Sequence, residues 1–167
     1  MLSDSPLRNL NFPSDTSKNI NMKIQLKKRE AFKVYGYVTE TNAENNDRDI
    51  GLLWSQYESV LRKIPESRGQ LYGVIWYTDE SHKRYCYFLG FESSREYNDY
   101  DFIEIPSGNF AVAKVSKKMT EMEAWTEFFY NAIPANNLVP DEKHGLYFEF
   151  YNENGNCELW APVIPKP

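Results

Sequence analysis

The sequence has little of the chemistry that cysteine and histidine provide. Its 167 residues include only two cysteines, Cys86 and Cys157, and two histidines, His82 and His144. No C-x-x-C pair occurs, and neither histidine has a partner at the spacing of a metal ligand. These shortages argue against a disulfide framework, a zinc site and a Cys-His catalytic pair. We therefore expect no metal and no cofactor.

Long apolar runs and an excess of basic residues are also missing. No run approaches the roughly 18 apolar residues that span a bilayer, and the N-terminus lacks a basic region followed by an apolar segment. The 24 acidic and 19 basic residues give a formal net charge of -5. Direct nucleic-acid binding is therefore not expected, whereas cationic partners are favoured. The composition predicts a soluble, cytoplasmic protein with no membrane association.

The chain divides into a polar leader and one domain. Residues 1–21 are rich in Ser, Asn and Asp without a sustained apolar period, which predicts a flexible N-terminal extension. Residues 22–167 have the length of one domain or of two small halves that share a core. No helix-turn-helix pattern precedes Met22, so we expect a stand-alone domain.

Aromatic residues are abundant and gather in one predicted hairpin. The chain has 12 Tyr, 10 Phe and 4 Trp, an excess that pocket walls would use. In the hairpin from His144 to Trp160, alternation places Glu149 between Tyr147 and Tyr151 on one strand face. After a turn at residues 154–155, we expect the return strand to add Glu158 and Trp160 to the same site.

Two interpretations of these carboxylates remain open. Glu158 is about as well explained by a solvated outer face, because antiparallel sheets are often polar on one side. For Glu149 this explanation is weaker, since its aromatic neighbours would leave a large apolar patch in water. A pocket for a flat cation explains both features, because ring faces attract positive charge and a buried carboxylate supplies the counter-charge. Burial should raise the pKa of Glu149.

The order of predicted elements repeats once along the chain. Each half reads strand, helix, strand, strand, which predicts an α+β fold built from a tandem βαββ repeat with pseudo-two-fold symmetry. The two helices should cover one side of antiparallel sheets, and the opposite faces should curve around a central cleft. Tyr77, Tyr85 and Tyr87 are the residues that the first half is expected to contribute to the cleft.

The predicted elements are a first strand from Ile24 to Val38 with a bend at 27–30, a helix over 50–64 capped by Asn46 or Asp47, strands 71–78 and 84–93, a strand pair or one kinked strand over 102–115, a helix from Thr120 that ends before Pro134, and the hairpin.

Eight segments in order resemble a known family. They are F-K-V-Y-G-Y, L-L-W-S-Q-Y, L-Y-G-V-I-W-Y, Y-C-Y-F-L-G-F-E, I-P-S-G-N-F-A-V, A-W-T-E-F-F-Y, Y-F-E-F-Y and E-L-W-A-P-V, and they cover Met22 to Pro165. The chain resembles the GyrI-like, or AraC-type, effector-binding domains, also called the SOUL-like or bacterial transcription activator effector-binding fold. The resemblance implies a cleft that binds small cationic or lipophilic molecules, with Glu149, Glu158 and Trp54 at the family's cleft positions.

Three functions follow as hypotheses. The first is a stand-alone binder of aromatic cations or related xenobiotics, with Glu149 as charge partner and aromatic walls from Tyr147, Tyr151, Trp160, Trp54, Tyr77 and Tyr87. The second is a hydrolase of cyclopropane-type genotoxins, an activity found in relatives, in which Glu149 is the base and Glu158 or a tyrosine the acid. The third is a protein-directed role on DNA gyrase or with a separate DNA-binding regulator.

Overall fold

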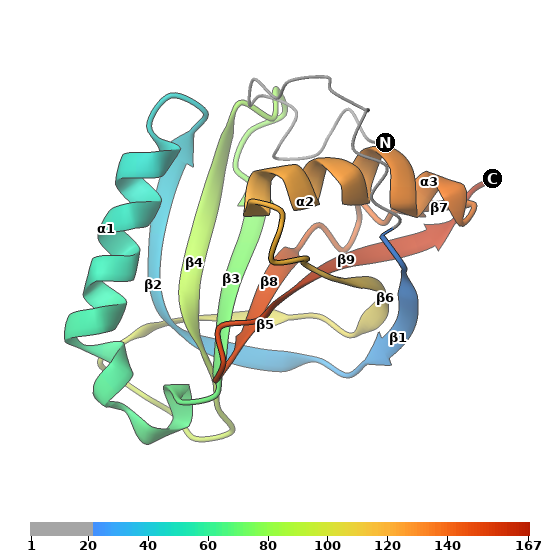
Figure 1. The fold of residues 1–167 in the computed structure, drawn as a ribbon. Coiled ribbons are helices and arrows are strands. Elements are labelled where there is room, and N and C mark those ends of the chain that lie inside the picture. The colour runs from blue at the N-terminus through green and yellow to red at the C-terminus, as the bar shows by residue number, and fades with distance from the viewer. Residues whose placement is uncertain (1–21) are drawn as a thin grey trace.

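The computed structural model describes residues 22–167, so the predicted extension lies outside the described residues (Figure 1). Nine strands, two main helices and several short helical turns make up this part of the chain. None of its helices combines the length and the hydropathy that a membrane crossing needs. In chain order the elements are β1 Gln25–Arg29, β2 Phe32–Asn42, α1 Asn46–Ser59, 3-10 turns Leu61–Lys63 and Pro65–Ser67, β3 Gln70–Tyr77, β4 Arg84–Glu92, β5 Asp101–Ile105, β6 Gly108–Lys114, α2 Glu121–Glu127, a π-helix Phe128–Ala132, α3 Ile133–Ala135, β7 Leu138–Pro140, β8 Tyr147–Asn152 and β9 Cys157–Pro165.

The strands form one antiparallel sheet whose order has a two-fold symmetry. The order is β1-β6-β9-β8-β3-β4-β2-β5, and β7 pairs with β9. Read from the other end, each strand meets its counterpart: β5 for β1, β2 for β6, β4 for β9 and β3 for β8. The units β2-α1-β3-β4 and β6-α2-β8-β9 are the two copies. The predicted α+β class and tandem βαββ repeat are confirmed.

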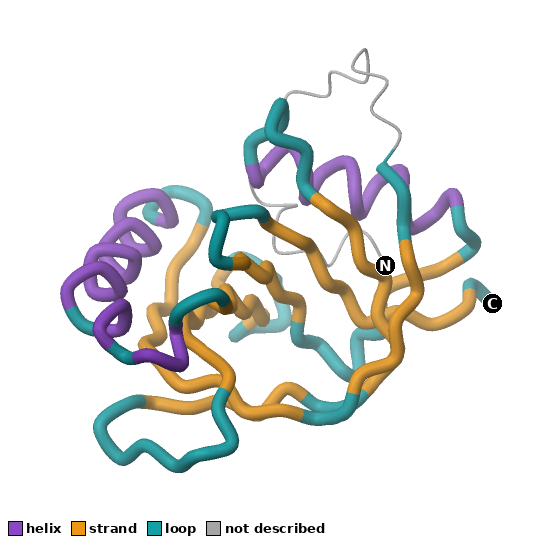
Figure 2. Tube along the Cα trace, turned by 60° about the horizontal axis from the view of Figure 1, so that its bottom comes forward, coloured by secondary structure: helices purple, strands orange, loops and turns teal. Residues whose placement is uncertain are grey.

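The two halves are joined by long kinked strands. β1 runs into β2 through a bend at residues 30–31, and β5 runs into β6 through a bend at 106–107. One continuous antiparallel register links them, from Gln25 opposite Val112 to Gly36 opposite Asp101. The sequence left open whether residues 102–115 form two strands or one kinked strand, and the unbroken register supports the kinked strand. The sheet therefore curls back on itself (Figure 2).

Each face of the sheet carries its own core. On one face α1 covers the β2–β4 half and α2 covers the β6–β9 half (Figure 1). Their shared core includes Leu53, Trp125, Phe129 and Tyr147. The curled opposite face encloses a second core of ten buried residues, Phe32, Val34, Tyr72, Val74, Phe88, Ile105, Phe110, Val112, Phe148 and Trp160. Burying one such large apolar side chain stabilises the fold by about 1.5 to 3 kcal/mol.

The first helix differs from its prediction at both ends. Its N-cap is Asn45, which makes no side-chain capping bond, so neither Asn46 nor Asp47 is the cap. The α-helix ends at Ser59, and two 3-10 turns follow, Leu61–Lys63 and Pro65–Ser67. The residue before a proline is driven out of the helical region, and Ile64 is accordingly extended at φ -83° and ψ 121°.

The second helix begins as predicted but continues further. Thr120 is the N-cap, and its hydroxyl accepts a 3.1 Å hydrogen bond from the backbone N–H of Glu123, which is the first of the two bonds of a capping box. The helix does not end before Pro134. A π-helical segment follows α2, and Pro134 then lies in the first turn of α3, where a missing N–H is tolerated.

Candidate ligand-binding site

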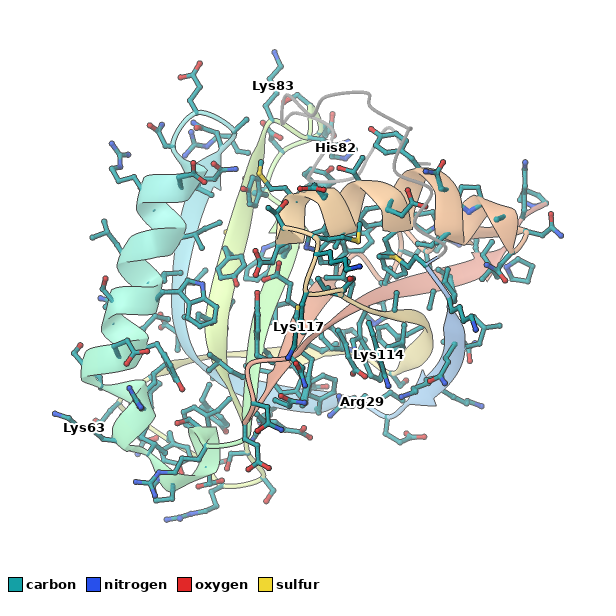
Figure 3. All side chains as sticks on the ribbon, in the orientation of Figure 1. Arg29, Lys63, His82, Lys83, Lys114 and Lys117 are labelled. Carbon is teal, nitrogen blue, oxygen red and sulfur yellow. The ribbon has the colours of Figure 1, made fainter. Side chains whose placement is uncertain are left out.

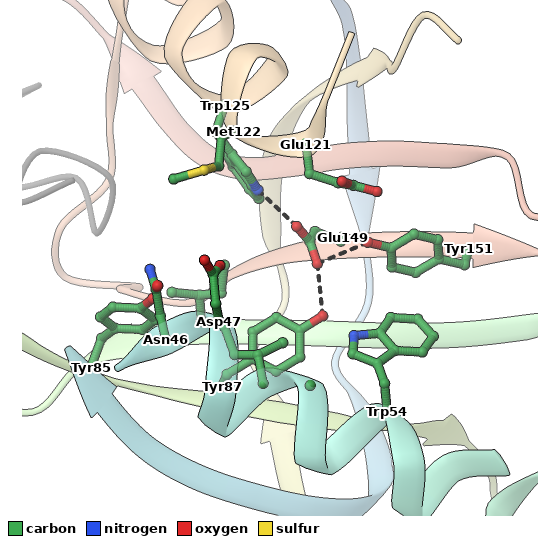
Figure 4. Close-up of a pocket in the computed structure, with 13 residues that line it drawn as sticks. Asn46, Asp47, Trp54, Tyr85, Tyr87, Glu121, Met122, Trp125, Glu149 and Tyr151 are labelled. Atoms are coloured by element: carbon green, nitrogen blue, oxygen red, sulfur yellow. Dashed lines mark hydrogen bonds between the residues drawn. The ribbon is translucent and has the colours of Figure 1, made fainter. Parts of the chain in front are cut away.

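A cavity of about 540 Å³ lies between α1, α2 and the sheet (Figure 4). This volume falls within the roughly 300 to 1,000 Å³ of small-molecule sites. The cavity opens on the helix-bearing face, so the prediction that the cleft lies on the face away from the helices is wrong. Thirteen residues line it: Asn46, Asp47, Ile50, Gly51, Trp54, Ile75, Tyr85, Tyr87, Glu121, Met122, Trp125, Glu149 and Tyr151.

Glu149 lies at the inner wall, and Gly73 makes room for it. Glu149 pairs with Gly73 across the β3–β8 ladder. A methyl group at position 73 would lie 2.2 Å from the Tyr87 hydroxyl and 2.9 Å from Oε1 of Glu149. Only glycine therefore lets these two side chains meet over β3, which is the close approach that a glycine inside a strand indicates.

Three donors from three elements bind the Glu149 carboxylate. The hydroxyls of Tyr87 on β4 and Tyr151 on β8 donate to Oε1 at 2.8 and 3.1 Å. The indole N–H of Trp125 on α2 donates to Oε2 at 2.9 Å. With the residue only 6% exposed, these contacts replace the water that a carboxylate would otherwise bind. Within the described part of the chain, the carboxylate is fixed in position with no positively charged partner.

Burial dominates the electrostatics of this group. It raises the pKa of the Glu149 carboxyl, while the hydrogen bonds from Trp125, Tyr87 and Tyr151 oppose the rise. Burial and the Glu149 charge together raise the pKa values of the Tyr87 and Tyr151 phenols well above their usual range. Both phenols are therefore neutral donors at physiological pH.

The walls are aromatic, and the charged residues in the described lining are all acidic. Trp54 on α1 meets Tyr151 edge to face, with ring centroids 5.2 Å apart and planes at 89°. Asp47 and Glu121 join Glu149 as the carboxylates of the lining, and none of the thirteen residues is Lys, Arg or His. Aromatic rings and uncompensated carboxylates are complementary to a cation.

Four of the eight predicted site residues meet in the cavity: Glu149, Tyr151, Trp54 and Tyr87. Tyr147 shares the Glu149 face but is buried behind the cavity against Phe129, with ring centroids 5.5 Å apart. Tyr77 lies at the end of β3 with its ring 4.1 Å from that of His82, in the β3–β4 turn at the top of Figure 3. Tyr77 is not part of the lining.

The structure separates Trp160 and Glu158 from Glu149. Trp160 pairs with Phe148 and Glu158 pairs with Phe150. Directly paired residues share a sheet face, and Phe148 and Phe150 face away from Glu149. Trp160 accordingly stacks on Phe148 at 5.2 Å and 16°. The prediction that Glu149 and Glu158 form an acid and base pair in one cleft is therefore wrong.

The sequence interpretation missed Trp125, Asp47 and Glu121. The helical spacing from Met122 to Ile133 predicts only an apolar stripe that includes Trp125, and Asp47 is one of the two predicted caps. The indole N–H of Trp125 was the one signal in the sequence for a role in the site, because a buried tryptophan usually finds a hydrogen-bond acceptor. Among residues 22–167 no three His, Cys, Asp or Glu gather to hold a metal ion.

Solved structures share this fold at low sequence identity. An integron cassette protein from Vibrio cholerae gives a TM-score of 0.65 at 16% identity, over 87% of this chain and all of that chain. SAV2435 bound to tetraphenylphosphonium gives 0.64 at 19% identity, over 86% and 94%. The C-terminal domain of EcmrR gives 0.58 at 11% identity, over 87% and 99%. The comparison with curated proteins gave no match.

A family model identifies the chain directly. Residues 25–163 match the model described as integron-associated effector binding protein, which spans nearly all of the described residues. Together with the structural neighbours, this match confirms the resemblance to effector-binding domains that the eight sequence segments indicate. The chain belongs to the Cass2 family of integron-associated effector binding proteins.

Proposed function

We propose that this protein binds aromatic or lipophilic cations in the cavity between α1 and α2, with Glu149 as the counter-charge. The observation that carries the proposal is a buried carboxylate held by three neutral donors, in an aromatic cavity that no basic side chain of residues 22–167 lines. A charge in that position is electrically uncompensated within the lining. A bound cation compensates it.

The hydrogen bonds to Glu149 favour a ligand without donors of its own. Three donors already occupy most of the roughly four acceptor sites of the carboxylate, so a ligand gains little by offering several N–H groups. A delocalised or quaternary cation needs only proximity to the charge and contact with ring faces. Tetraphenylphosphonium, the molecule bound to SAV2435, has this chemistry.

The cavity walls support selection by shape and stacking. Trp54, Tyr85 and Trp125 present ring surface, and Ile50, Ile75 and Met122 present aliphatic surface. Such walls accept many flat or bulky apolar groups, which predicts a broad ligand range of the multidrug-binding kind. Specificity for positive charge then rests on Glu149.

Titration of tetraphenylphosphonium against wild type and Glu149→Gln tests the proposal. Losing the charge while the neutral amide keeps the side-chain shape should weaken binding by about 10-fold or more, because removing one member of a buried charge pair costs about 2 kcal/mol or more. Glu158→Gln is the matched control, since it removes the same charge from the opposite face of the sheet. Equal affinities of wild type and Glu149→Gln would remove Glu149 from the mechanism.

The other hypotheses receive less support. A hydrolase that pairs Glu149 with Glu158 is not proposed, because the two carboxylates lie on different sheet faces. A role on gyrase or beside a separate DNA-binding regulator stays a prediction, to be tested with a supercoiling assay and with co-purification.

A further inference from the structure

Two carboxylates at the cavity have no hydrogen-bond or ion-pair partner among the described residues. Asp47 and Glu121 both line the cavity and both are exposed. Neither makes a hydrogen bond or an ion pair with another residue in 22–167. They come from the first turns of α1 and α2, so the two copies of the βαββ unit each contribute one.

Acids in a first helical turn are ordinarily explained by the helix dipole. Each helix has a second first-turn acid, and these two acids have side-chain partners within the described residues. Asp49 accepts a 2.8 Å hydrogen bond from the Thr41 hydroxyl, and Glu123 accepts a 3.4 Å hydrogen bond from the Thr120 hydroxyl. Asp47 and Glu121 are the remaining first-turn acids, and both line the cavity.

The charge of the cavity therefore exceeds what one cation balances. Glu149 lies buried at the inner wall, and the two exposed acids lie at the mouth. A single positive centre beside Glu149 leaves the two outer carboxylates unbalanced. The volume of about 540 Å³ leaves room for a spacer and a second charged group.

We infer that the preferred ligands are elongated dications, with one cationic centre beside Glu149 and the other between Asp47 and Glu121. This inference rests on the proposed function, because it uses the same cavity and the same inner charge. It narrows the ligand class from lipophilic cations in general to molecules with two positive centres joined by an apolar spacer.

A matched ligand pair tests the inference. Decamethonium carries a trimethylammonium group at each end of a ten-carbon chain, and decyltrimethylammonium has the same chain with one such group. An apolar mouth would favour the monocation, whose free end is hydrocarbon. The inference predicts that wild type binds decamethonium about 4- to 25-fold more tightly, since each of the two exposed charge pairs contributes on the order of two- to fivefold. The preference should shrink in 0.5 M salt.

Variants at the mouth supply the second arm. Asp47→Asn combined with Glu121→Gln should abolish the preference while changing the affinity for the monocation by less than about threefold. Glu96→Gln, an exposed charge removed outside the cavity lining, is the control and should leave both affinities unchanged. Thermal melting of each variant checks that it is folded.

The possible outcomes separate this inference from the proposed function. Equal or tighter binding of decyltrimethylammonium by wild type, or a preference that survives the double variant, would overturn the dication inference. If the affinity for both ligands still falls in Glu149→Gln, the proposed function remains supported. Failure of decyltrimethylammonium and tetraphenylphosphonium to bind would overturn both.

Discussion

Gly73 lies directly opposite Glu149 in the β3–β8 ladder, and the Tyr87 hydroxyl reaches the carboxylate through the space that a side chain at 73 would fill. A hydrogen bond across the sheet thus depends on the missing side chain of a third residue. The buried charge, its donor and the glycine form one unit, and changing any of them changes the environment of the other two.

Gly73→Ala should therefore destabilise the fold and weaken cation binding together. The new methyl group would lie 2.2 Å from the Tyr87 hydroxyl, so the phenol must leave Glu149. Overpacking of this kind costs about 1 to 3 kcal/mol of unfolding free energy, measured by urea denaturation. Unchanged stability would show that Tyr87 can move without cost.

Substitution of Gly51 by alanine should have the opposite effect on stability to Gly73→Ala. Gly51 lies within α1 at the cavity wall, and a methyl group there would have no heavy atom within 4 Å. Gly51→Ala should raise the unfolding free energy by about 0.5 to 1 kcal/mol, because alanine is the better helix former. Gly51→Phe should exclude tetraphenylphosphonium from the cavity. Titration of both variants would separate helix propensity from occlusion, and full binding by Gly51→Phe would place the ligand elsewhere.

Trp125→Phe removes one donor from Glu149 and keeps an aromatic ring. The ring that stacks on Phe129, with centroids 5.3 Å apart and planes at 13°, is retained in smaller form. Loss of the indole N–H should cost about 1 to 3 kcal/mol of unfolding free energy at neutral pH, where Oε2 loses its donor. The cost should fall at acid pH, where the carboxyl is protonated. A pH-independent cost would assign the effect to packing alone.

The raised pKa of Glu149 predicts opposite pH trends for stability and binding. The folded state holds this proton to higher pH than the unfolded chain, so the group's contribution to stability falls as pH rises from about 4.3 through the folded pKa. Cation affinity should rise over the same interval. Tetraphenylphosphonium titrations between pH 4 and 8 check this, and Glu149→Gln should flatten most of the pH dependence. A flat wild-type profile would contradict it.

The repeated βαββ pattern and the face of Glu149 were predictable from the sequence, because period-two alternation decides which residues of one strand share a side. The register of the hairpin was not. The connection between Asn152 and Cys157 is longer than the two-residue turns that fix a register, so the pairing of Trp160 with Phe148 depends on the core behind them.

The position of the cavity could not be predicted from local sequence patterns either. Alternation assigns Glu149 to a face but does not show which face the helices cover. Trp125 and Asp47 join the site only because α2 and α1 flank the same cavity over the sheet. These contacts are between residues far apart in sequence.

The exchanged outer strands restrict how a guest molecule enters. β1 precedes the first repeat yet pairs with β6 of the second, and β5 precedes the second repeat yet pairs with β2 of the first. Separating the two halves of the sheet would break the β1–β6 and β2–β5 ladders at the same time. A guest instead reaches the cavity from the helix-bearing face, where the cavity opens, so uptake rates should respond to changes in α1 and α2 while both ladders stay paired.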